Sequence, residues 1–205
     1  MYSAFSQFPS NRELYVKAHR QGLRVSYPFI LPNEVENTIA QMRHLEAVTV
    51  PVLGVFGTSS QQGKFTVQLV LRRLLLQMGY KVGQIGTEHH ARLFGMDLAF
   101  PIGYASPLSM SYQNYAPYLE AKMRQINCKR PDIILVGAQS GTIPYDIHES
   151  NTHSLSTLAF LLGTKPDACI LVVNSIDPDD YILDTLNALR SLGKAPTILL
   201  AMSDK

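Results

Sequence analysis

The chain contains the stretch Val52-Leu-Gly-Val-Phe56, followed directly by Gly57-Thr58-Ser59-Ser60-Gln61-Gln62-Gly63-Lys64-Phe65-Thr66. The first five residues predict a buried β-strand, and residues 64–78, closed by Gly79, predict a helix. Between the two, glycine lets the backbone curl so that successive amides point inward, and the helix N-terminus adds a partial positive charge. Lys64 adds a full positive charge. The stretch therefore predicts a loop that binds the phosphates of a nucleotide or of a nucleotide-containing cofactor.

This loop departs at two positions from the usual P-loop motif, G-x-x-x-x-G-K-[ST]. Counted back from Gly63, Thr58 occupies the position of the first glycine, although Gly57 precedes it. Phe65 replaces the hydroxyl residue that normally ligates magnesium, and Thr66 is the nearest hydroxyl. We expect residues 57–66 to bind phosphate, with Thr66 as the candidate metal ligand.

Predicted strands and helices alternate through the rest of the chain. The strands are apolar at successive positions, as in residues 133–136, which is typical of strands buried on both faces. We therefore predict an α/β fold that is P-loop NTPase-like, with a mostly parallel sheet and helices on both faces. Beyond the first strand and helix, we expect strands at residues 81–85, 132–136, 169–173 and 197–201, helices at residues 117–125, 154–162 and 179–192, and a long loop at residues 95–114.

The first fifty residues differ from the rest and predict two helices, at residues 12–21 and 33–47. Pro32 gives the second helix a start signal, and Val35, Ile39 and Met42 fall on one of its faces. We expect residues 1–50 to form a short N-terminal helical appendage and residues 51–205 a nucleotide-binding domain. Because the last predicted strand lies so close to Lys205, we also expect either that a partner covers that end, as in a homo-oligomer, or that the chain is a piece of a longer protein.

The composition excludes several classes of protein. Among the 205 residues, 46% are hydrophobic and 17% charged, and 18 basic against 16 acidic side chains give a net charge of +2, which does not favour a nucleic-acid binder. Cys128 and Cys169 are far apart and form no metal-binding or disulfide pattern. No stretch resembles a secretion signal or a membrane span. We expect a cytoplasmic protein that acts on a small molecule.

The loop resembles the P-loop of dethiobiotin synthetase and its relatives in its Gly-Thr-x-x-x-x-Gly-Lys-x-Thr pattern. It is more similar to a two-domain P-loop family that includes the D-glutamate N-acetyltransferases of D-amino-acid catabolism, in which an apolar residue and then threonine also follow the lysine. The similarity extends from Val50 to the C-terminus and includes residues 79–87, 135–141 and 161–168. The first resemblance implies ATP and a ligase or phosphotransferase, and the second implies acetyl-CoA and an amino-acid N-acetyltransferase.

The chain departs from both families at one position that matters for metal binding. The families tend to place a glutamate at the end of the strand that matches residues 133–136, where a carboxylate helps to hold magnesium, but this chain has Gly137. The relatives that resemble the acetyltransferases also have a large N-terminal domain, of which the first fifty residues would be only a remnant.

Two residues after the second predicted strand are candidate catalytic residues beside Lys64. Glu88 stands near the place where related P-loop proteins keep an acidic metal or substrate contact, so it is a candidate metal ligand; a solvated loop glutamate is an equal alternative. His89 is a candidate for proton transfer or substrate contact. Since His89 and His90 are adjacent on an extended chain, their side chains point to opposite faces and do not favour one shared metal ion.

Polar residues also follow the later strands. Gln139 and Ser140 come after the strand that ends at Val136, and ligands of open parallel sheets collect at the carboxyl ends of the strands. We expect these two residues to contact substrate or phosphate. Asp179 follows the next strand, and we interpret it as a cap and dipole partner of the helix that begins there.

Three functional hypotheses follow. The first is an enzyme that binds ATP, with or without magnesium, and acts on a small carboxylate or amino acid as a ligase or phosphotransferase. The lack of a hydroxyl at position 65 and of an acid at position 137 counts against magnesium-assisted phosphoryl transfer. The second is an acetyl-CoA-dependent amino-acid N-acetyltransferase, for which no metal is needed. The third is a non-catalytic nucleotide-binding subunit.

Overall fold

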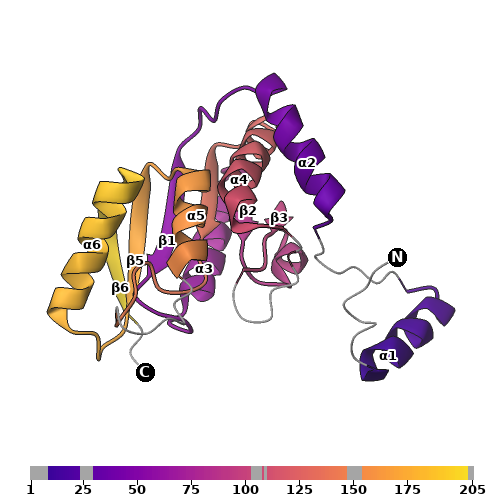
Figure 1. Ribbon diagram of the computed structural model, residues 1–205, viewed down its shortest axis with the longest axis horizontal. Coiled ribbons are helices and arrows are strands. Elements are labelled where there is room, and N and C mark those ends of the chain that lie inside the picture. The colour runs from indigo at the N-terminus through magenta and orange to yellow at the C-terminus, as the bar shows by residue number, and fades with distance from the viewer. Residues whose placement is uncertain (1–8, 24–29, 103–107, 109, 147–153, 203–205) are drawn as a thin grey trace.

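The computed structural model describes residues 9–23, 30–102, 108, 110–146 and 154–202. In these residues, six strands form one sheet in the order β3-β2-β4-β1-β5-β6, and every neighbouring pair is parallel. Figure 1 shows the sheet with α4 and α5 in front of it and α3 behind it, whereas α1 stands apart. The strands are β1 (Val52–Gly57), β2 (Val82–Gly86), β3 (Leu98–Ala99), β4 (Ile133–Gly137), β5 (Ala168–Val173) and β6 (Thr197–Met202).

The helices cover both faces because the crossovers run in both directions from the centre of the sheet. The connection from β1 to β2 runs one way along the sheet, whereas those that reach β4, β5 and β6 run the other way. Since crossovers between parallel strands are right-handed, α3 lies on the face opposite to the later helices. The helices are α1 (Pro9–Arg20), α2 (Pro32–Gln41), η2 (Met42–His44), α3 (Lys64–Gln77), η3 (Ala91–Phe94), α4 (Tyr112–Asn127), α5 (Ser154–Thr164) and α6 (Asp179–Gly193). The predicted fold class is confirmed.

The predicted strands and helices are all present, with corrections at the long loop, at the start of α4 and at the end of α2. The predicted loop at residues 95–114 is wrong, since it contains β3 and the first residues of α4. The prediction took Pro117 as a helix start, but Pro117 lies inside α4, which begins at Tyr112. The predicted helix at residues 33–47 is too long, because α2 ends at Gln41 and only a 3-10 turn follows it.

Helix α2 packs on α4 through one buried face and one polar contact. Val35 and Thr38 are buried. The hydroxyl of Tyr118 donates a hydrogen bond to Glu34 Oε1 over 2.9 Å, and Lys122 Nζ lies 3.2 Å from the same oxygen. Burial and the negative charge of Glu34 raise the pKa of Tyr118 well above its usual value. The hydroxyl therefore stays protonated and keeps its role as a donor to α2.

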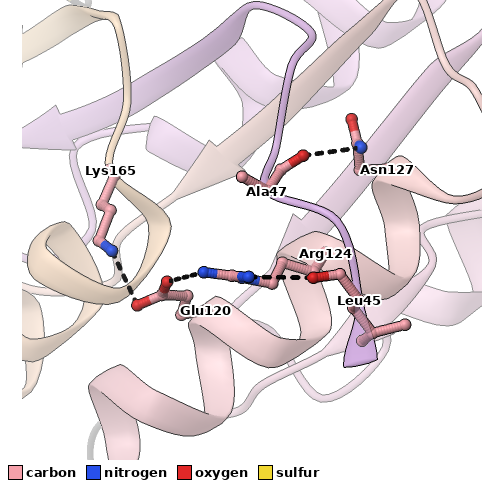
Figure 2. A network of polar contacts seen from close by, with 6 residues as sticks. All are labelled: Leu45, Ala47, Glu120, Arg124, Asn127 and Lys165. Carbon is pink, nitrogen blue, oxygen red and sulfur yellow. Dashed lines mark hydrogen bonds and ion pairs between the residues drawn. The ribbon is translucent and has the colours of Figure 1, made fainter. Parts of the chain in front are cut away.

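A second polar network lies on α4 and holds the segment that leads into β1 (Figure 2). Arg124 donates through Nη1 to the carbonyl of Leu45 over 3.0 Å and through Nη2 to Glu120 over 2.8 Å. Lys165, which follows α5, donates to the other oxygen of Glu120 over 2.7 Å. Burial would raise the pKa of Glu120, but the hydrogen bonds from Lys165 and Arg124 hold it below the usual value. The network joins three segments that are distant in the sequence.

Strand β6 forms one edge of the sheet in the described part of the chain. Its apolar side chains are largely exposed, and Ile198 and Met202 are each 63% exposed. Exposed edge strands usually carry charged residues that prevent pairing with other chains, and β6 carries none. None of the helices found in the described residues has the length and apolar character needed to span a membrane.

The contact between α4 and α5 depends on Gly163. A Cβ atom at this position would lie 2.7 Å from the carbonyl oxygen of Ala116 and 2.8 Å from Leu119 Cβ. We expect Gly163→Ala to lower the free energy of unfolding by about 1–3 kcal/mol because it forces the two helices apart. Helix propensity alone would give the opposite sign, a gain of about 1 kcal/mol. Urea denaturation gives the free energy of unfolding of the variant and of the wild type. A variant more stable than the wild type would contradict the expected clash between α4 and α5.

Candidate phosphate-binding site

The loop after β1 begins at the centre of the carboxyl edge, because β1 lies between β4 and β5. Two residues with positive φ curl it, namely Gln61 at 60° and Gly63 at 90°. Gly63 is the N-cap residue of α3, so the helix starts at Lys64, as the sequence predicts. The amides of the loop and the first turn of α3 therefore share one edge of the sheet, where an anion is stabilised.

Lys64 lies beneath the loop with only 5% of its surface exposed. Its Nζ donates a hydrogen bond to the carbonyl of Ser59. A Cβ atom on Gly57 would lie 2.9 Å from Lys64 Cδ and 3.1 Å from Nζ, so a side chain at position 57 would displace the lysine. Burial lowers the pKa of Lys64 to about 8, although the negative charge of Glu88 partly opposes this shift.

Gln62 occupies the inside of the loop. Its Oε1 accepts a hydrogen bond from the amide of Ser59 over 2.9 Å, and its Nε2 donates to Thr58 Oγ1 over 2.6 Å. Gln62 is only 8% exposed. The amide of Ser59 is one of the donors that such a loop offers to phosphate, so a bound phosphate oxygen would compete with Gln62 for it.

Asp177, in the loop between β5 and α6, holds the start of the phosphate loop from outside. Its Oδ2 accepts hydrogen bonds from Thr58 Oγ1, from Gln62 Nε2 over 3.3 Å and from the amide of Asn174 over 2.7 Å. This role was not predicted from the sequence, in which Asp179 was interpreted as a cap and dipole partner. That assignment is wrong in part, because the N-cap position of α6 is Pro178, whereas Asp179 does lie in the first turn.

Two further segments fix the backbone of the loop. The hydroxyl of Tyr181 in α6 lies 2.6 Å from the carbonyl of Thr58 and 3.0 Å from that of Ile143. Burial, and then the charge of Asp177, raise the pKa of Tyr181 to about 12, so it stays a donor. Thr142 donates to the carbonyl of Gly57 through both its amide and its hydroxyl, over 2.9 and 3.0 Å.

The structure places the candidate metal ligands Thr66 and Glu88 beside different strands. Thr66 is exposed and lines a pocket at the ends of β5 and β6, whereas Glu88 follows β2 and is half-buried. Phe65 lies on the side of Glu88, with its ring centroid 5.3 Å from that of His90 and 5.6 Å from that of Phe94. Among the described residues, no three His, Cys, Asp or Glu side chains form a group that would hold a metal ion.

At Gly137, the last residue of β4, Gln68 occupies the space that the side chain expected from the resemblance would need. A Cβ atom on Gly137 would overlap the carboxamide of Gln68, which reaches it from α3. Gln68 is 1% exposed, and its Oε1 has no hydrogen-bond partner in the described part of the structure. A neutral carboxamide therefore fills the position at which a strand-end carboxylate was expected.

The remaining candidates lie on the same carboxyl edge. Gln139 is half-buried, and with its amide oriented to satisfy both contacts, its nitrogen donates to the carbonyls of Ile102 over 2.5 Å and Thr87 over 2.9 Å. It thus joins the segments that follow β2 and β3. Ser140 is buried against Thr157 of α5, with the two hydroxyl oxygens 2.9 Å apart. His89 is exposed.

A pocket of ≈ 660 Å³ adjoins the loop on the other side. It lies between the start of α3 and the ends of β5 and β6, and Thr66, Asn174 and Met202 are among the residues that line it. Pockets of about 300–1,000 Å³ accommodate ligands of the size of a nucleoside or a drug. The loop therefore has room beside it for the part of a ligand that extends from the phosphates.

Removing the carboxylate of Asp177 tests its role in holding the loop. We expect Asp177→Ala to lower the free energy of unfolding by about 1–3 kcal/mol, because it leaves the Thr58 hydroxyl, which is 1% exposed, without its acceptor. Asp180→Ala is the matched control, since this exposed residue in the first turn of α6 contributes about 0.3–1 kcal/mol. Urea denaturation measures both losses, and equal losses would contradict the role of Asp177.

The affinity of the loop for a phosphate ligand should depend on pH. Lys64 is charged below its pKa of about 8 and neutral above it, and a phosphate binds the charged form. We expect the affinity for ADP to be constant between about pH 7 and that pKa and to fall above it by up to about tenfold per pH unit, until the pKa of the complex is reached. Lys64→Met should bind more weakly, without this decline. Below about pH 7, protonation of the terminal phosphate of ADP, whose pKa is about 6, also weakens binding. Titration calorimetry at pH values below and above the pKa of Lys64 measures the affinity of both proteins. A wild-type affinity that does not fall at high pH would contradict the role of Lys64 in phosphate binding.

Comparison with known proteins finds a solved structure of similar fold. No curated protein matches the chain. A solved structure of a DUF1611 family protein from Anabaena variabilis ATCC 29413 is similar to it in fold, with a TM-score of 0.55 and 16% identity over 78% of this chain and 46% of that one. The chain thus spans less than half the length of that protein. A weaker likeness is to the BceF tyrosine kinase domain, with a TM-score of 0.46 and 17% identity over 95% of this chain and 90% of that one. Another is to the Signal Recognition Particle 54 kDa protein from Aeropyrum pernix K1, solved in complex with GDP, with a TM-score of 0.46 and 13% identity over 95% of this chain and 54% of that one.

The family comparison covers the loop and nearly all of the sheet. Residues 38–191, more than half of the chain, match one family profile, which takes in α3 and the strands β1 to β5. The expectation of a P-loop fold is confirmed. The chain belongs to the family described as "Domain of unknown function (DUF1611_C) P-loop domain".

Proposed function

We propose that this domain binds the phosphates of a nucleotide-containing cofactor through residues 57–66, as part of an enzyme that acts on a small carboxylate or amino acid. The observation that supports it best is the buried ammonium group of Lys64, held under a curled loop at the start of α3. A buried lysine at a helix N-terminus attracts anions by its own charge and by the helix dipole. The pocket beside the ends of β5 and β6 would receive the nucleoside part of the ligand.

The two candidate cofactors differ in their need for a metal ion. Phosphoryl transfer from ATP normally requires magnesium at the outer phosphates, held by a hydroxyl and a carboxylate next to the loop. These residues do not fit that role, because Phe65 stands at the hydroxyl position and Gly137 at the carboxylate position. Acyl transfer from acetyl-CoA needs only that its diphosphate be held. We therefore favour the N-acetyltransferase over the ATP-dependent ligase or phosphotransferase.

The proposed reaction assigns roles to the remaining candidates. The amine nitrogen of the acceptor attacks the thioester carbon of acetyl-CoA, a C–N bond forms, the C–S bond breaks, and the CoA thiol leaves. A base must take the proton from the amine. Glu88 and His89, which follow β2 at the carboxyl edge, are the candidates for this base. Gln139 and Ser140, after β4, would lie near the acceptor.

We also propose that the protein is cytoplasmic and that it self-associates. Cys128 is exposed and Cys169 is buried, and both are free thiols, which fits a reducing cytoplasm. The apolar edge strand β6 supports the proposal that the protein self-associates.

The proposed binding is tested by titration calorimetry of the purified protein with acetyl-CoA and with ATP. We expect acetyl-CoA to bind, and Lys64→Ala to weaken that binding about 10- to 100-fold, the usual effect of losing a hydrogen bond to a charged group. Lys17→Ala, at an exposed position of α1, is the matched control. ATP binding that requires magnesium would favour the ligase or phosphotransferase instead. The proposal fails if neither ligand binds, or if Lys64→Ala binds as tightly as the wild type.

A further inference from the structure

We infer that Gln68 is a specificity-determining residue, which replaces the strand-end carboxylate and adapts this loop to bind a diphosphate without a divalent cation. The inference rests on the proposed phosphate binding and deepens it. It explains two departures from the usual motif, Phe65 and Gly137, as parts of one arrangement in which the neutral side chain of a third residue completes the site.

Gln68 lies close to Lys64 on α3 and close to the end of β4. Lys64 and Gln68 are four residues apart in α3, so they lie on the same face of the helix, one turn apart. Both are buried, at 5% and 1% exposure. Lys64 reaches under the loop to Ser59, and Gln68 reaches Gly137 at the carboxyl end of β4. Gly137 pairs with Val55 of β1, only two residues before the loop begins. The carboxamide therefore lies against Gly137, on the face of the sheet that α3 covers.

The carboxamide of Gln68 occupies the space that a side chain at position 137 would need, since a Cβ atom there would overlap Gln68 Nε2. A glutamate at the end of β4 would therefore require the carboxamide to move. In this chain, a side chain from the facing helix fills the place of a strand-end carboxylate.

The carboxamide of Gln68 is neutral, which changes the charge next to a bound phosphate. Magnesium is usually held through one or two carboxylates, and a carboxylate beside a phosphate needs such a cation to offset the repulsion between the two. With a carboxamide there, position 137 adds no negative charge that would oppose the attraction of Lys64 and the N-terminus of α3 for the phosphates. On the other side, Phe65 packs its ring against His90 and Phe94 and offers no oxygen to a metal.

The oxygen of the Gln68 carboxamide also bears on ligand binding. Gln68 Oε1 is buried and has no hydrogen-bond partner in the described residues. Leaving a buried acceptor unpaired is unfavourable, and an apolar side chain of the same shape would avoid it. An acceptor that points toward the end of β4 suits a donor that arrives with the ligand, such as a water molecule bound to a phosphate.

The test is titration calorimetry of the full chain with acetyl-CoA, and with ATP where acetyl-CoA does not bind, in EDTA and in excess magnesium chloride. For the wild type we expect dissociation constants for acetyl-CoA within about twofold of each other in the two buffers. Gln68→Glu keeps the shape of the side chain and restores the carboxylate. We expect it to bind about tenfold or more weakly in EDTA, and magnesium to recover most of that loss.

Gln84→Glu is the matched control. Gln84 is also a fully buried glutamine with an unpaired amide atom, but it lies on β2 with Arg72 3.4 Å from its oxygen. We expect no effect of magnesium on ligand binding by this variant. Thermal unfolding in both buffers shows whether each variant is folded, and Gln68→Met, which should bind equally in both buffers, serves if Gln68→Glu does not fold.

The outcomes separate this inference from the function it rests on. If magnesium strengthens acetyl-CoA binding by the wild type several-fold, the inference is wrong while the phosphate-binding proposal stands. A folded Gln68→Glu variant that magnesium does not rescue also overturns it. If the wild type binds neither ligand in either buffer, the proposed function fails and the inference fails with it.

Discussion

The burial of one ammonium group organises the carboxyl edge of this sheet. Lys64 is taken out of water, which lowers its pKa, and the surrounding backbone must offset the loss of solvation. The carbonyl of Ser59 provides one acceptor, and glycine at position 57 leaves the space in which the side chain lies. The loop curls at Gln61 and Gly63 so that it closes over the lysine. A ligand phosphate would complete the neutralisation that the protein alone provides only in part.

The shape of the loop depends on neighbours that are distant in the sequence. Because β1 lies between β4 and β5, the segments after both strands reach it: Thr142 binds the carbonyl of Gly57, and Asp177 binds the side chain of Thr58. Tyr181 adds a contact from α6. The loop is thus held at its first two residues by other segments, and after them by the contacts of Gln62 and Lys64 with Ser59. This arrangement keeps the donors in place before any ligand arrives, which reduces the entropy that binding must oppose.

The sequence predicted what is local and missed what depends on contacts across the fold. The alternation of buried strands with helices is visible in continuous apolar runs, and the loop is visible because its glycines, its lysine and the helix start are adjacent. Strand β3 has two residues, too few for a pattern, and α4 begins with polar and aromatic residues before Pro117. The contacts of Gln68 with Gly137 and of Asp177 with Thr58 join positions that no spacing rule connects. An acidic residue after a strand next to β1 was the only available signal for Asp177.

The side chain of Gln62 inside the loop has a consequence for the time course of binding. Its Oε1 accepts a hydrogen bond from the amide of Ser59, so in the proposed function it would compete with a phosphate for this amide at high effective concentration. Gln62 would have to leave the amide before the ligand takes it, and this unimolecular step would make the observed association rate level off at high ligand concentration. The same side chain would return when the ligand leaves, which would shorten the lifetime of partly dissociated complexes.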